Sequence, residues 1–433
     1  MDLHKRIPSS AVQHREENED VILAGWAAEV KNMGKIAFIK LRDREGEVQI
    51  VIPQDCPQFS KVNDITKESV IVIHGKVKQG KQKSGAKEVM LHEFEIMSAA
   101  DPNLPIDVTG KIPTGLDKRL DFRLLDLRNP KHLAIFKVRN IINWAARQFM
   151  MKEGVIEMQT PKIISAGAEG GATLFPVLYY DKKAYLSQSQ QLYKQMMLIA
   201  GFEKVFEIGP SFRAEKSHTM RHFTEFTQID FEMSFINDED DVLKFIEHMF
   251  VHVCKTVNES CAEQLKLLGV TIDVPALPFP RVTFEHAMTM LKEAGESPPE
   301  DDINIEMEKK LGVLIQKKFK TDAFFITKYP WNQRAFYIMN DNGTSRGFDF
   351  EYRGTELVSG GQREHRYANL CKNIEAKELK VKDFEFYTEP FKYGAPTHGG
   401  FGMGVDRLTM KLLNLENIRE ACLFPRDPER LVP

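Results

Sequence analysis

The sequence predicts an α+β protein in which a small β-barrel precedes a larger, mostly antiparallel sheet flanked by helices. Within residues 20–100, five short runs rich in β-branched and aromatic residues are separated by turns that contain glycine. From residue 131 onward, long amphipathic segments alternate with short strand-like runs. A chain of 433 residues is long enough for two or three domains.

The N-terminal part, residues 1–104, supplies the strands of the predicted barrel. These strands are Val21–Trp26, Ala37–Arg42, Val48–Ile52, Val70–Gly75 and Val89–Ile96. Five short strands in such a small stretch are typical of the five-stranded OB-fold barrel, which binds oligonucleotides.

A hinge over residues 105–130 follows, because Pro105 and Pro113 break regular structure. The second domain, 131–433, opens with an amphipathic helix that Gly154 ends, and it carries a helical insertion at about 238–320. Its other predicted elements are strands near 184–188, 204–213, 223–235, 323–327, 335–339, 347–352 and 355–360, a helix at 362–375, and a strand–helix unit at 399–415.

Composition excludes several classes of protein. The net charge of −3 argues against a surface covered in positive charge, although the basic run Lys76–Lys87 is either a solvated hairpin loop or a local basic face. The five cysteines form no CxxC pair, so neither a zinc site nor a disulfide framework is indicated. No run approaches the roughly 18 apolar residues of a membrane span, and no signal peptide is apparent, which predicts a cytoplasmic protein without membrane contact.

Two arginine-containing segments carry the most chemical information. The first is Phe212–Glu215, followed by Arg221 and His222, and the second is Gly400–Arg407. Arg213 and Glu215 are two residues apart, so on a strand they face the same side. A guanidinium can bind phosphate oxygens in a fork, and a carboxylate can accept from an adenine amine or bind a metal. Two such strands facing each other would form an ATP site without a P-loop.

These segments resemble the signature motifs of class II aminoacyl-tRNA synthetases. The helix with Arg139 that leads to Glu157–Pro161 resembles the first signature, which forms a dimer interface; Phe212–His222 resembles the second, and Gly402–Arg407 the third. A barrel before this core resembles the aspartate, asparagine and lysine subgroup. No large domain is inserted between the second and third signatures, which resembles the compact archaeal layout. The resemblance implies a homodimer that uses ATP and binds tRNA.

Two further stretches separate the members of the subgroup. Gln188–Gln195 resembles the QSPQLYKQ stretch of the aspartyl enzymes, and Ser359–His365 resembles their SGAQREH stretch. The resemblance implies that Lys194 and Arg363 reach the side-chain carboxylate of aspartate. It also implies that the same pocket is lined by Glu169, Gln191, Asp230 and Ser359. The chain departs from the pattern at Gln190, where proline is common, and at Gly361, where alanine is common.

Electrostatics supports aspartate independently of the resemblance. Aspartate and asparagine are nearly isosteric, so shape cannot distinguish them. We expect asparagine to leave the two buried cations, Lys194 and Arg363, uncompensated, at a cost of several kcal/mol. A site built for a polar group typically rejects the analogue lacking it by about 10⁴–10⁵, so no editing domain is required.

The resemblance also assigns a nucleotide site. It implies that Arg213 holds the α-phosphate, that Arg407 holds the γ-phosphate and packs on the adenine, and that Phe226 covers the other face of the base. Glu215 would accept from the adenine amine and act with both arginines in catalysis. The remaining implied ATP contacts are Arg221, His222, Glu356 and Gly404, and Glu356 and Ser359 would hold Mg²⁺.

The barrel is the expected reader of the tRNA anticodon. The resemblance implies that Phe38 stacks on a base and Gln49 hydrogen-bonds to one. Lys40 and Arg42 share the strand parity of Phe38, which places this face outside the barrel; the alternative is that Phe38 fills the interior. Aspartate and asparagine anticodons differ in one base, and the sequence leaves open whether tRNA(Asp) alone or also tRNA(Asn) is charged.

The resemblance therefore implies ATP-dependent ligation of L-aspartate to tRNA through an aspartyl-adenylate. Lys194 together with Arg363 argues against an asparaginyl or a lysyl enzyme, and the barrel argues against an amide synthetase of the same catalytic fold. A non-catalytic tRNA-binding paralogue would show damage at the catalytic positions, whereas the four that were considered are intact: Arg213, Glu356, Arg363 and Arg407.

Overall fold

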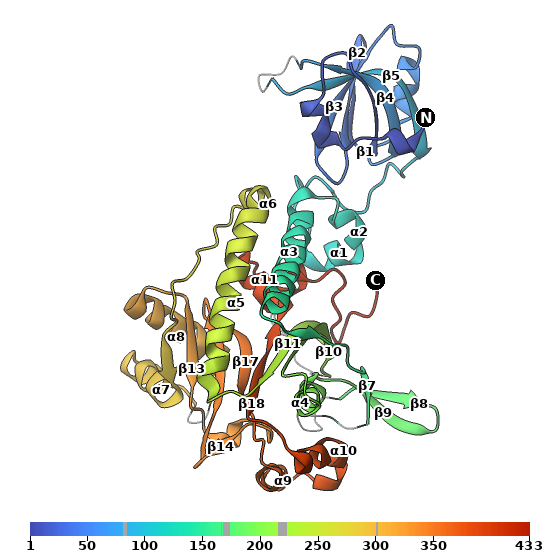
Figure 1. Cartoon of the computed structure of the whole chain (residues 1–433). Coiled ribbons are helices and arrows are strands. Elements are labelled where there is room, and N and C mark those ends of the chain that lie inside the picture. Colours follow the sequence, from blue (N-terminus) through green and yellow to red (C-terminus); the bar gives the residue numbers. More distant parts are fainter. Residues whose placement is uncertain (81–84, 166, 168–173, 215–222, 300–301) are drawn as a thin grey trace. The chain divides into compact units, whose positions relative to one another are not determined.

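The structure is a computed structural model that describes residues 1–80, 85–165, 167, 174–214, 223–299 and 302–433. The chain divides into two compact units, 1–115 and 116–433 (Figure 1). Each unit is considered by itself.

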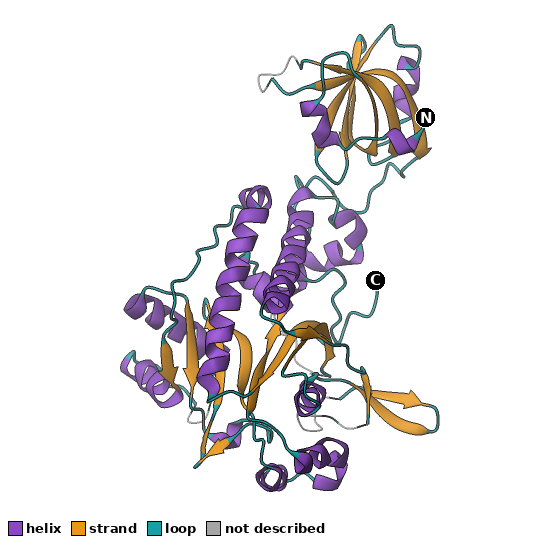
Figure 2. Ribbon diagram, in the orientation of Figure 1, coloured by secondary structure: helices purple, strands orange, loops and turns teal. Residues whose placement is uncertain are grey.

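In the described part of unit 1, five strands close into a barrel in the order β1-β2-β3-β5-β4 (Figure 2). The strands are β1 Asp20–Asn32, β2 Ile36–Arg42, β3 Glu47–Pro53, β4 Val70–Lys78 and β5 Glu88–Ser98. β1 is long enough to pair with β4 through its first half and with β2 through its second half. The barrel closes through a parallel pair in which Ile50 of β3 lies opposite Val89 of β5. The predicted five-stranded barrel is confirmed.

Alternation along the strands builds the barrel core. In β1 the side chains of Val21, Leu23 and Ala27 are buried, whereas those of Ile22, Ala24 and Trp26 are more exposed. They pack with Ile39 of β2 and Ile73 of β4, both fully buried. Because successive side chains of a strand point to opposite faces, one apolar set fills the barrel.

Unit 2 is built on one sheet. In its described residues eight strands run in the order β12-β13-β16-β17-β18-β11-β10-β6, and every neighbouring pair is antiparallel except the two edge pairs, β12·β13 and β10·β6. These strands are β6 Ile156–Glu157, β10 Lys204–Phe212, β11 Glu225–Ser234, β12 Arg281–Thr283, β13 Ala323–Thr327, β16 Gly347–Tyr352, β17 Glu356–Gln362 and β18 His398–Gly404. The predicted mostly antiparallel sheet is confirmed.

Smaller sheets and the helices complete unit 2. A three-stranded sheet contains β7 Ile163–Ile164, β9 Lys182–Leu186 and β8 Pro176–Tyr179, and a two-stranded one contains β14 Asn340–Asp341 and β15 Thr344–Ser345. The helices are α1 Leu116–Asp121, α2 Arg123–Asp126, α3 Pro130–Lys152, α4 Gln191–Ile199, α5 Glu239–Ser260, α6 Ala262–Leu268, α7 Phe284–Glu293, α8 Ile305–Phe319, α9 Tyr367–Ala376, α10 Glu385–Thr388 and α11 Val405–Leu412.

The long helices α3 and α5 cover one face of the sheet. They pack side by side (Figure 1), and their apolar residues join those of α11 and of the central strands in one core cluster. Ile229 and Phe231 of β11 and Phe401 and Met403 of β18 belong to this cluster. The alternate residues of the same strands therefore face the opposite side of the sheet.

One predicted strand is wrong, and one predicted helix starts later than expected. The apolar run 335–339 is a loop, because Ile338 closes a turn on Ala335 and its carbonyl accepts from the Trp331 indole at 2.9 Å. The helix predicted at 362–375 begins later, at Tyr367, because Gln362 still pairs with Gly399 in the sheet.

Within the predicted hinge, the structure has the short helices α1 and α2. Buried Arg123 of α2 donates to Asp126 Oδ2 at 2.6 Å and to the carbonyl of Cys422 at 2.7 Å, so these helices are held to the C-terminal segment of unit 2. None of the helices in the described ranges is long and apolar enough to cross a membrane.

Candidate active site

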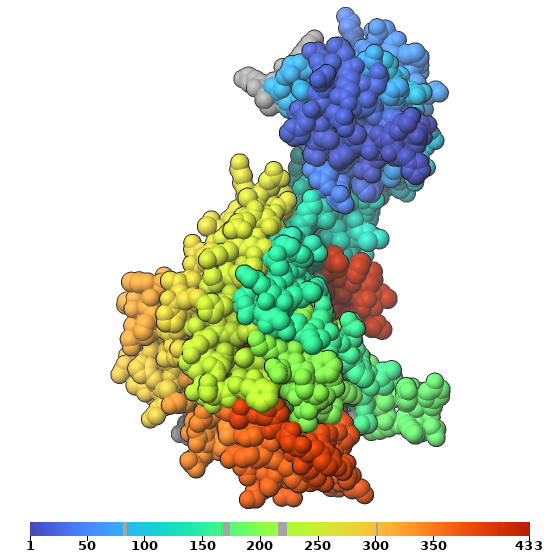
Figure 3. All heavy atoms as spheres, in the orientation of Figure 1, coloured from blue at the N-terminus to red at the C-terminus, as the bar shows by residue number. Residues whose placement is uncertain are grey.

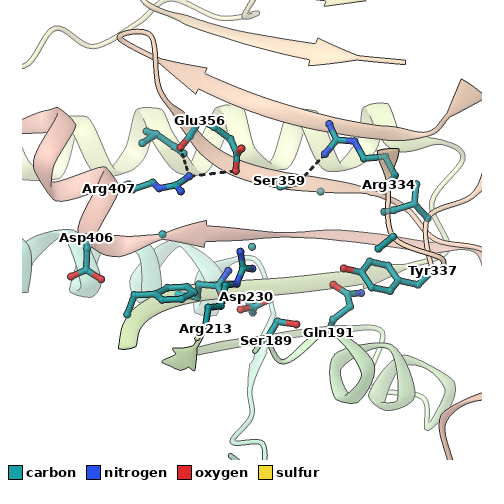
Figure 4. A pocket seen from close by; sticks show the side chains of 18 of the residues that line it. Ser189, Gln191, Arg213, Asp230, Arg334, Tyr337, Glu356, Ser359, Asp406 and Arg407 are labelled. Carbon is teal, nitrogen blue, oxygen red and sulfur yellow. Dashed lines mark hydrogen bonds and ion pairs between the residues drawn. The ribbon is translucent and has the colours of Figure 1, made fainter. Parts of the chain in front are cut away.

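A cavity of about 470 Å³ opens on the face of the sheet opposite α3 and α5 (Figure 4). Its lining comes from β11, β17, β18, the start of α4, the first turn of α11, and the loop 333–338. The lining residues that the sequence predicted for the site are Gln191, Arg213, Phe226, Asp230, Glu356, Ser359, Arg363, Gly404 and Arg407.

Strand alternation places acidic groups on this face. In β11, Asp230 and Glu232 alternate with the core residues Ile229 and Phe231. The neighbouring strand β18 leaves room for them with glycine: a Cβ atom on Gly400 would lie 2.3 Å from Glu232 Oε2 and 2.1 Å from the Phe231 carbonyl oxygen. No larger residue fits at position 400 unless the strands move apart.

A fully buried charge cluster lies beside the cavity. Arg363 grips Glu232 with two nitrogens, Nε to Oε1 at 2.7 Å and Nη2 to Oε2 at 3.2 Å. Lys194 Nζ donates to Asp230 Oδ1 at 2.9 Å and to the Phe401 carbonyl at 3.0 Å, and lies 3.4 Å from Glu232 Oε2. The two predicted cations, from α4 and from the segment after β17, thus meet on one carboxylate.

The pKa shifts in this cluster show that its charges support one another. Burial acts to raise the pKa of Glu232, but Arg363 and Lys194 outweigh it and the net shift is downward. Burial likewise acts to lower the pKa of Arg363, but the charge of Glu232 outweighs burial and the net shift is upward. Burial lowers the pKa of the nearby His398 to about 4, so at neutral pH His398 adds no charge. The formal charges of Lys194, Arg363, Asp230 and Glu232 sum to zero.

This balance corrects one expectation. Lys194 and Arg363 do not wait uncompensated for a substrate carboxylate, because Glu232 already contacts both. The two cations also differ in access: Arg363 lines the cavity, whereas Lys194 is fully buried behind Asp230 and is absent from the described lining.

The other end of the cavity has looser contacts. Arg407, in the first turn of α11, donates from Nη1 to the Glu356 carbonyl at 3.2 Å, and the same nitrogen lies 3.6 Å from Glu356 Oε1. Arg213 lies over the Phe226 ring, with 5.5 Å between Cζ and the centroid. Figure 4 shows Arg407 and Glu356 on one wall and Arg213 on the other.

A buried carboxylate ties three distant segments to this site. Asp406 accepts from Arg139 of α3 at 2.8 Å and from the backbone N–H of Thr227 in β11 at 3.0 Å. Since Arg407 follows Asp406, these two contacts fix the position from which Arg407 enters the cavity. Two of the segments joined are the ones that resemble the first and third signatures, and the other is β11, which follows the second.

Comparison with known proteins agrees with this architecture. The family described as "tRNA synthetases class II (D, K and N)" matches residues 115–428, and "OB-fold nucleic acid binding domain" matches residues 21–97. The chain belongs to the class II tRNA synthetases.

The similarity to other proteins extends over nearly the whole length of this synthetase. An aspartate–tRNA(Asp/Asn) ligase of Methanopyrus kandleri is 46% identical, with 98% of each chain covered. An aspartate–tRNA(Asp) ligase of Pyrococcus abyssi is 45% identical, with 98% of this chain and 99% of the relative covered. Among solved structures, an asparaginyl-tRNA synthetase from Pyrococcus horikoshii in complex with asparaginyl-adenylate has a TM-score of 0.92 at 33% identity, with 99% of both chains covered.

Some predicted site residues of the synthetase cannot be located. Glu169, Glu215, Arg221 and His222 lie outside the described residues. Gln191 begins α4, lines the cavity and donates to Gln195 Oε1 at 2.9 Å.

In the barrel, the residues that share a strand face with Phe38 differ in how exposed they are. Phe38 is half-buried, and Lys40 on the same face is exposed. Arg42 shares their parity but does not reach solvent: it is buried and pairs with buried Glu68 at 2.6 Å. Arg42 therefore does not support the expectation that this whole face lies outside the barrel. Gln49 donates to Glu88 Oε2 at 3.1 Å.

Three residues of the site were missed by sequence reasoning. Glu232 follows Asp230 with the parity of one strand face, a signal that was available in Asp230-Phe231-Glu232. Arg334 lies in the loop that was taken for a strand. Asp349 lies opposite Ser359 in the β16·β17 register and is held by Arg334, and no local pattern marks it.

Proposed function

We propose that this synthetase ligates L-aspartate to tRNA(Asp) through an aspartyl-adenylate, with ATP as the second substrate. The observation that carries the proposal is Arg363, a cation that lines the cavity and is held in place by Glu232, which Lys194 also contacts. The aspartate–tRNA ligases that cover the chain at 45–46% identity support the same substrate.

The proposed reaction has two steps. The α-carboxylate of aspartate attacks the α-phosphorus of ATP and pyrophosphate leaves. A hydroxyl of the terminal tRNA adenosine then attacks the carbonyl carbon of the mixed anhydride, and AMP leaves. Both steps depend on placing the reactants and stabilising charge on phosphate, so fixed cations serve them better than a protein nucleophile.

At the amino-acid end, Arg363 is oriented for the side-chain carboxylate of aspartate. Glu232 occupies Nε and Nη2 of the guanidinium, and no described residue accepts from Nη1. Since Arg363 lines the cavity, Nη1 is the nitrogen we assign to the substrate. Lys194 supports this orientation through its contact with Glu232. Asp230 and Gln191 border the pocket, and Ser359 faces it from β17. Glu169 is assigned to the α-amino group.

At the nucleotide end, Arg213 and Phe226 are assigned to the α-phosphate and the adenine, and Arg407 and Gly404 to the γ-phosphate side. The position of the Arg213 guanidinium over the Phe226 ring supports the assignment of these two residues to one nucleotide. Glu215 is assigned to the adenine amine, and Arg221 and His222 to the terminal phosphates.

Glu356 and Ser359 have the oxygen donors that suit Mg²⁺. Burial and the charge of Asp349 raise the pKa of Glu356, as expected for a carboxylate placed where a cation would stabilise it. No three His, Cys, Asp or Glu gather as a metal site within the described ranges, so nucleotide oxygens would complete the shell. Mg²⁺ bound there would neutralise phosphate charge.

The barrel is assigned to the tRNA anticodon, through Phe38 and Gln49. The half-exposed ring of Phe38 beside Lys40 suits a stacked base near the phosphate backbone. The relatives include enzymes named for tRNA(Asp) and for tRNA(Asp/Asn), so charging of tRNA(Asn) is a further activity to test.

We assign the protein to the cytoplasm and to a homodimer. Large apolar side chains are exposed along the end of α3 and the short strands after it: Trp144, Met151, Ile156 and Ile163. The β8–β9 hairpin extends from the rest of unit 2 (Figure 3), with Leu178 96% exposed. A second copy would cover this surface, and sedimentation would detect it; a fully active monomer would contradict the dimer.

The direct test is charging of separated tRNA(Asp) and tRNA(Asn) with labelled aspartate and labelled asparagine. The proposal expects aspartate on tRNA(Asp) and no asparagine on either. Asparagine on tRNA(Asn) would establish the alternative, an asparaginyl-tRNA synthetase. A protein that binds tRNA and charges neither would be a non-catalytic paralogue.

A further inference from the structure

Arg334 is a third arginine of the cavity, and the assigned reaction gives it no role. It follows a short 3-10 turn, Trp331–Gln333, and lines the cavity. Its guanidinium lies flat on the buried Tyr329 ring, with 3.7 Å between Cζ and the ring centroid. A cation stacked on an aromatic ring in a nearly water-free place is held in a defined position.

The guanidinium connects two oxygen groups of neighbouring strands. It holds Asp349 of β16 with Nη1 to Oδ1 at 3.0 Å and Nη2 to Oδ2 at 2.6 Å. Nη1 also donates to Ser359 Oγ of β17 at 3.2 Å (Figure 4). Asp349 and Ser359 lie opposite each other in the strand register, so Arg334 bridges the two strands.

Arg334 stands between the cavity and the acidic group behind it. Arg334, Ser359 and Glu356 line the cavity, whereas Asp349 is absent from the described lining. Without Arg334, Asp349, Glu356 and Ser359 would form an oxygen-rich wall of the kind that binds divalent cations.

We infer that Arg334 is a positioning residue that keeps a divalent cation out of the Glu356–Ser359 wall until the nucleotide is bound. The inference rests on the proposed function, which assigns Glu356 and Ser359 to Mg²⁺. A fixed positive charge hydrogen-bonded to a metal ligand repels a second cation at that ligand. The metal therefore enters with the polyphosphate, whose negative charge offsets the guanidinium.

A second detail fits this role. Arg334 Nε is buried and has no acceptor among the described residues, although both terminal nitrogens are occupied. A nucleotide phosphate that draws the guanidinium toward the cavity would supply that acceptor, because phosphate accepts from several arginine nitrogens at once. Arg334 thus has one donor left for nucleotide oxygens.

The test is metal binding without nucleotide. Mn²⁺ is titrated into the ATP-free full-length protein, and free Mn²⁺ is followed by electron paramagnetic resonance. Arg334→Gln removes the charge and keeps donors for Asp349, and it should bind Mn²⁺ at least about tenfold more tightly than the native protein. Arg334→Lys keeps the charge and should stay within about threefold of native.

Arg346→Gln is the matched control. Arg346 also pairs with two carboxylates, Glu239 and Asp341, but is absent from the described cavity lining. Its loss should leave Mn²⁺ affinity unchanged. Equal affinity in native and Arg334→Gln protein would overturn the inference, as would equal tightening in the glutamine and lysine variants or in the Arg346 control.

The native protein provides an independent measurement if Arg334→Gln does not fold. Anomalous scattering from crystals soaked in Mn²⁺ alone should show no manganese beside Ser359, and soaking with Mn²⁺ and ATP should show it. Manganese beside Ser359 without ATP, while Arg334 still holds Asp349, would contradict the inference. Aspartate activation by the native protein is measured separately, so failure of the proposed function is distinguishable from failure of this inference.

Discussion

The two ends of the cavity hold their charges in different ways. At the amino-acid end, Lys194, Arg363, Asp230 and Glu232 are fully buried and paired with one another at 2.7–3.4 Å. At the nucleotide end, the side chains of Arg407 and Glu356 are 25% and 36% exposed, and their charged atoms are 3.6 Å apart. The amino-acid end is fixed before any substrate arrives, whereas the Arg407–Glu356 pair at the nucleotide end is held more loosely.

The difference matches what each substrate requires. Telling aspartate from asparagine depends on one small group, so the receiving nitrogens must be fixed and their charge balanced in advance. A polyphosphate carries several charges and many acceptors, so cations near solvent can follow it. We therefore expect mutations at the amino-acid end to change both stability and specificity, and mutations at the nucleotide end to change ATP affinity with little loss of stability.

The largest effect is expected from Arg363→Leu. It removes the cation that lines the cavity and leaves Glu232 with Lys194 alone, a loss of about 3–5 kcal/mol, or roughly 10³-fold, in kcat/KM for aspartate. ATP–pyrophosphate exchange measures it, with ATP binding unchanged. Arg366→Leu is the control, because that arginine pairs with Glu364 and is 49% exposed. Normal exchange in Arg363→Leu would refute the assignment of this end.

Glu232→Gln is expected to destabilise the fold by about 3–5 kcal/mol at pH 7, because two buried cations lose their shared partner. The folded pKa of Glu232 is lowered, so its contribution is present above the unfolded pKa of about 4.3 and is lost as pH falls through the folded pKa. Urea unfolding should therefore show a gap between the two proteins that narrows below pH 4. A variant as stable as native at pH 7 would mean that the cluster is not fixed in advance; exposed Glu375→Gln is the neutral control.

Arg407→Ala separates the two ends kinetically. Loss of charged hydrogen bonds to phosphate should raise KM for ATP by about 10–100-fold. The KM for aspartate should change little, because the described contacts of Arg407 are with Glu356 and not with the buried cluster. Exchange assays with each substrate varied in turn measure both, and an equal rise in the two constants would show that the ends are coupled.

The smallest effect is expected from Glu356→Gln in the ligand-free protein. The folded pKa of Glu356 is raised, so ionised Glu356 lowers the stability of the fold at neutral pH. The native protein regains that stability as pH falls through the folded pKa and Glu356 is protonated. The variant should melt at most about 2 °C higher than native at pH 7, and the gain should shrink as pH falls through the folded pKa of Glu356. A lower melting temperature at pH 7 would show that Glu356 is a stabilising group instead of one held for a ligand.

Much of this comparison could be predicted from residues close together in sequence. Barrel strands follow from alternation, and Lys194 and Arg363 follow from the stretches that contain them. The strand face of Glu232 was predictable from its parity with Asp230. Its ion-pair partner was not, because Arg363 is 131 residues away. The parity rule also misplaced Arg42, whose ion pair with Glu68 depends on how the barrel closes.

The nucleotide end was less predictable where loops meet the sheet. The run 335–339 is apolar enough for a strand, yet the Trp331 indole donates a hydrogen bond to the Ile338 carbonyl, and the segment forms a loop that lines the cavity. Arg334 and Asp349 become neighbours only through that loop, and neither residue type is unusual at its own position. Tertiary contacts decided these residues, and single-sequence patterns do not contain such contacts.

The most direct test of the central claim is ATP–pyrophosphate exchange by the native protein with aspartate and with asparagine. A carboxylate received by Arg363, with Lys194 held behind it by Glu232, predicts a ratio of kcat/KM of at least about 10⁴ in favour of aspartate. Comparable exchange with the two amino acids, or faster exchange with asparagine, would contradict the account.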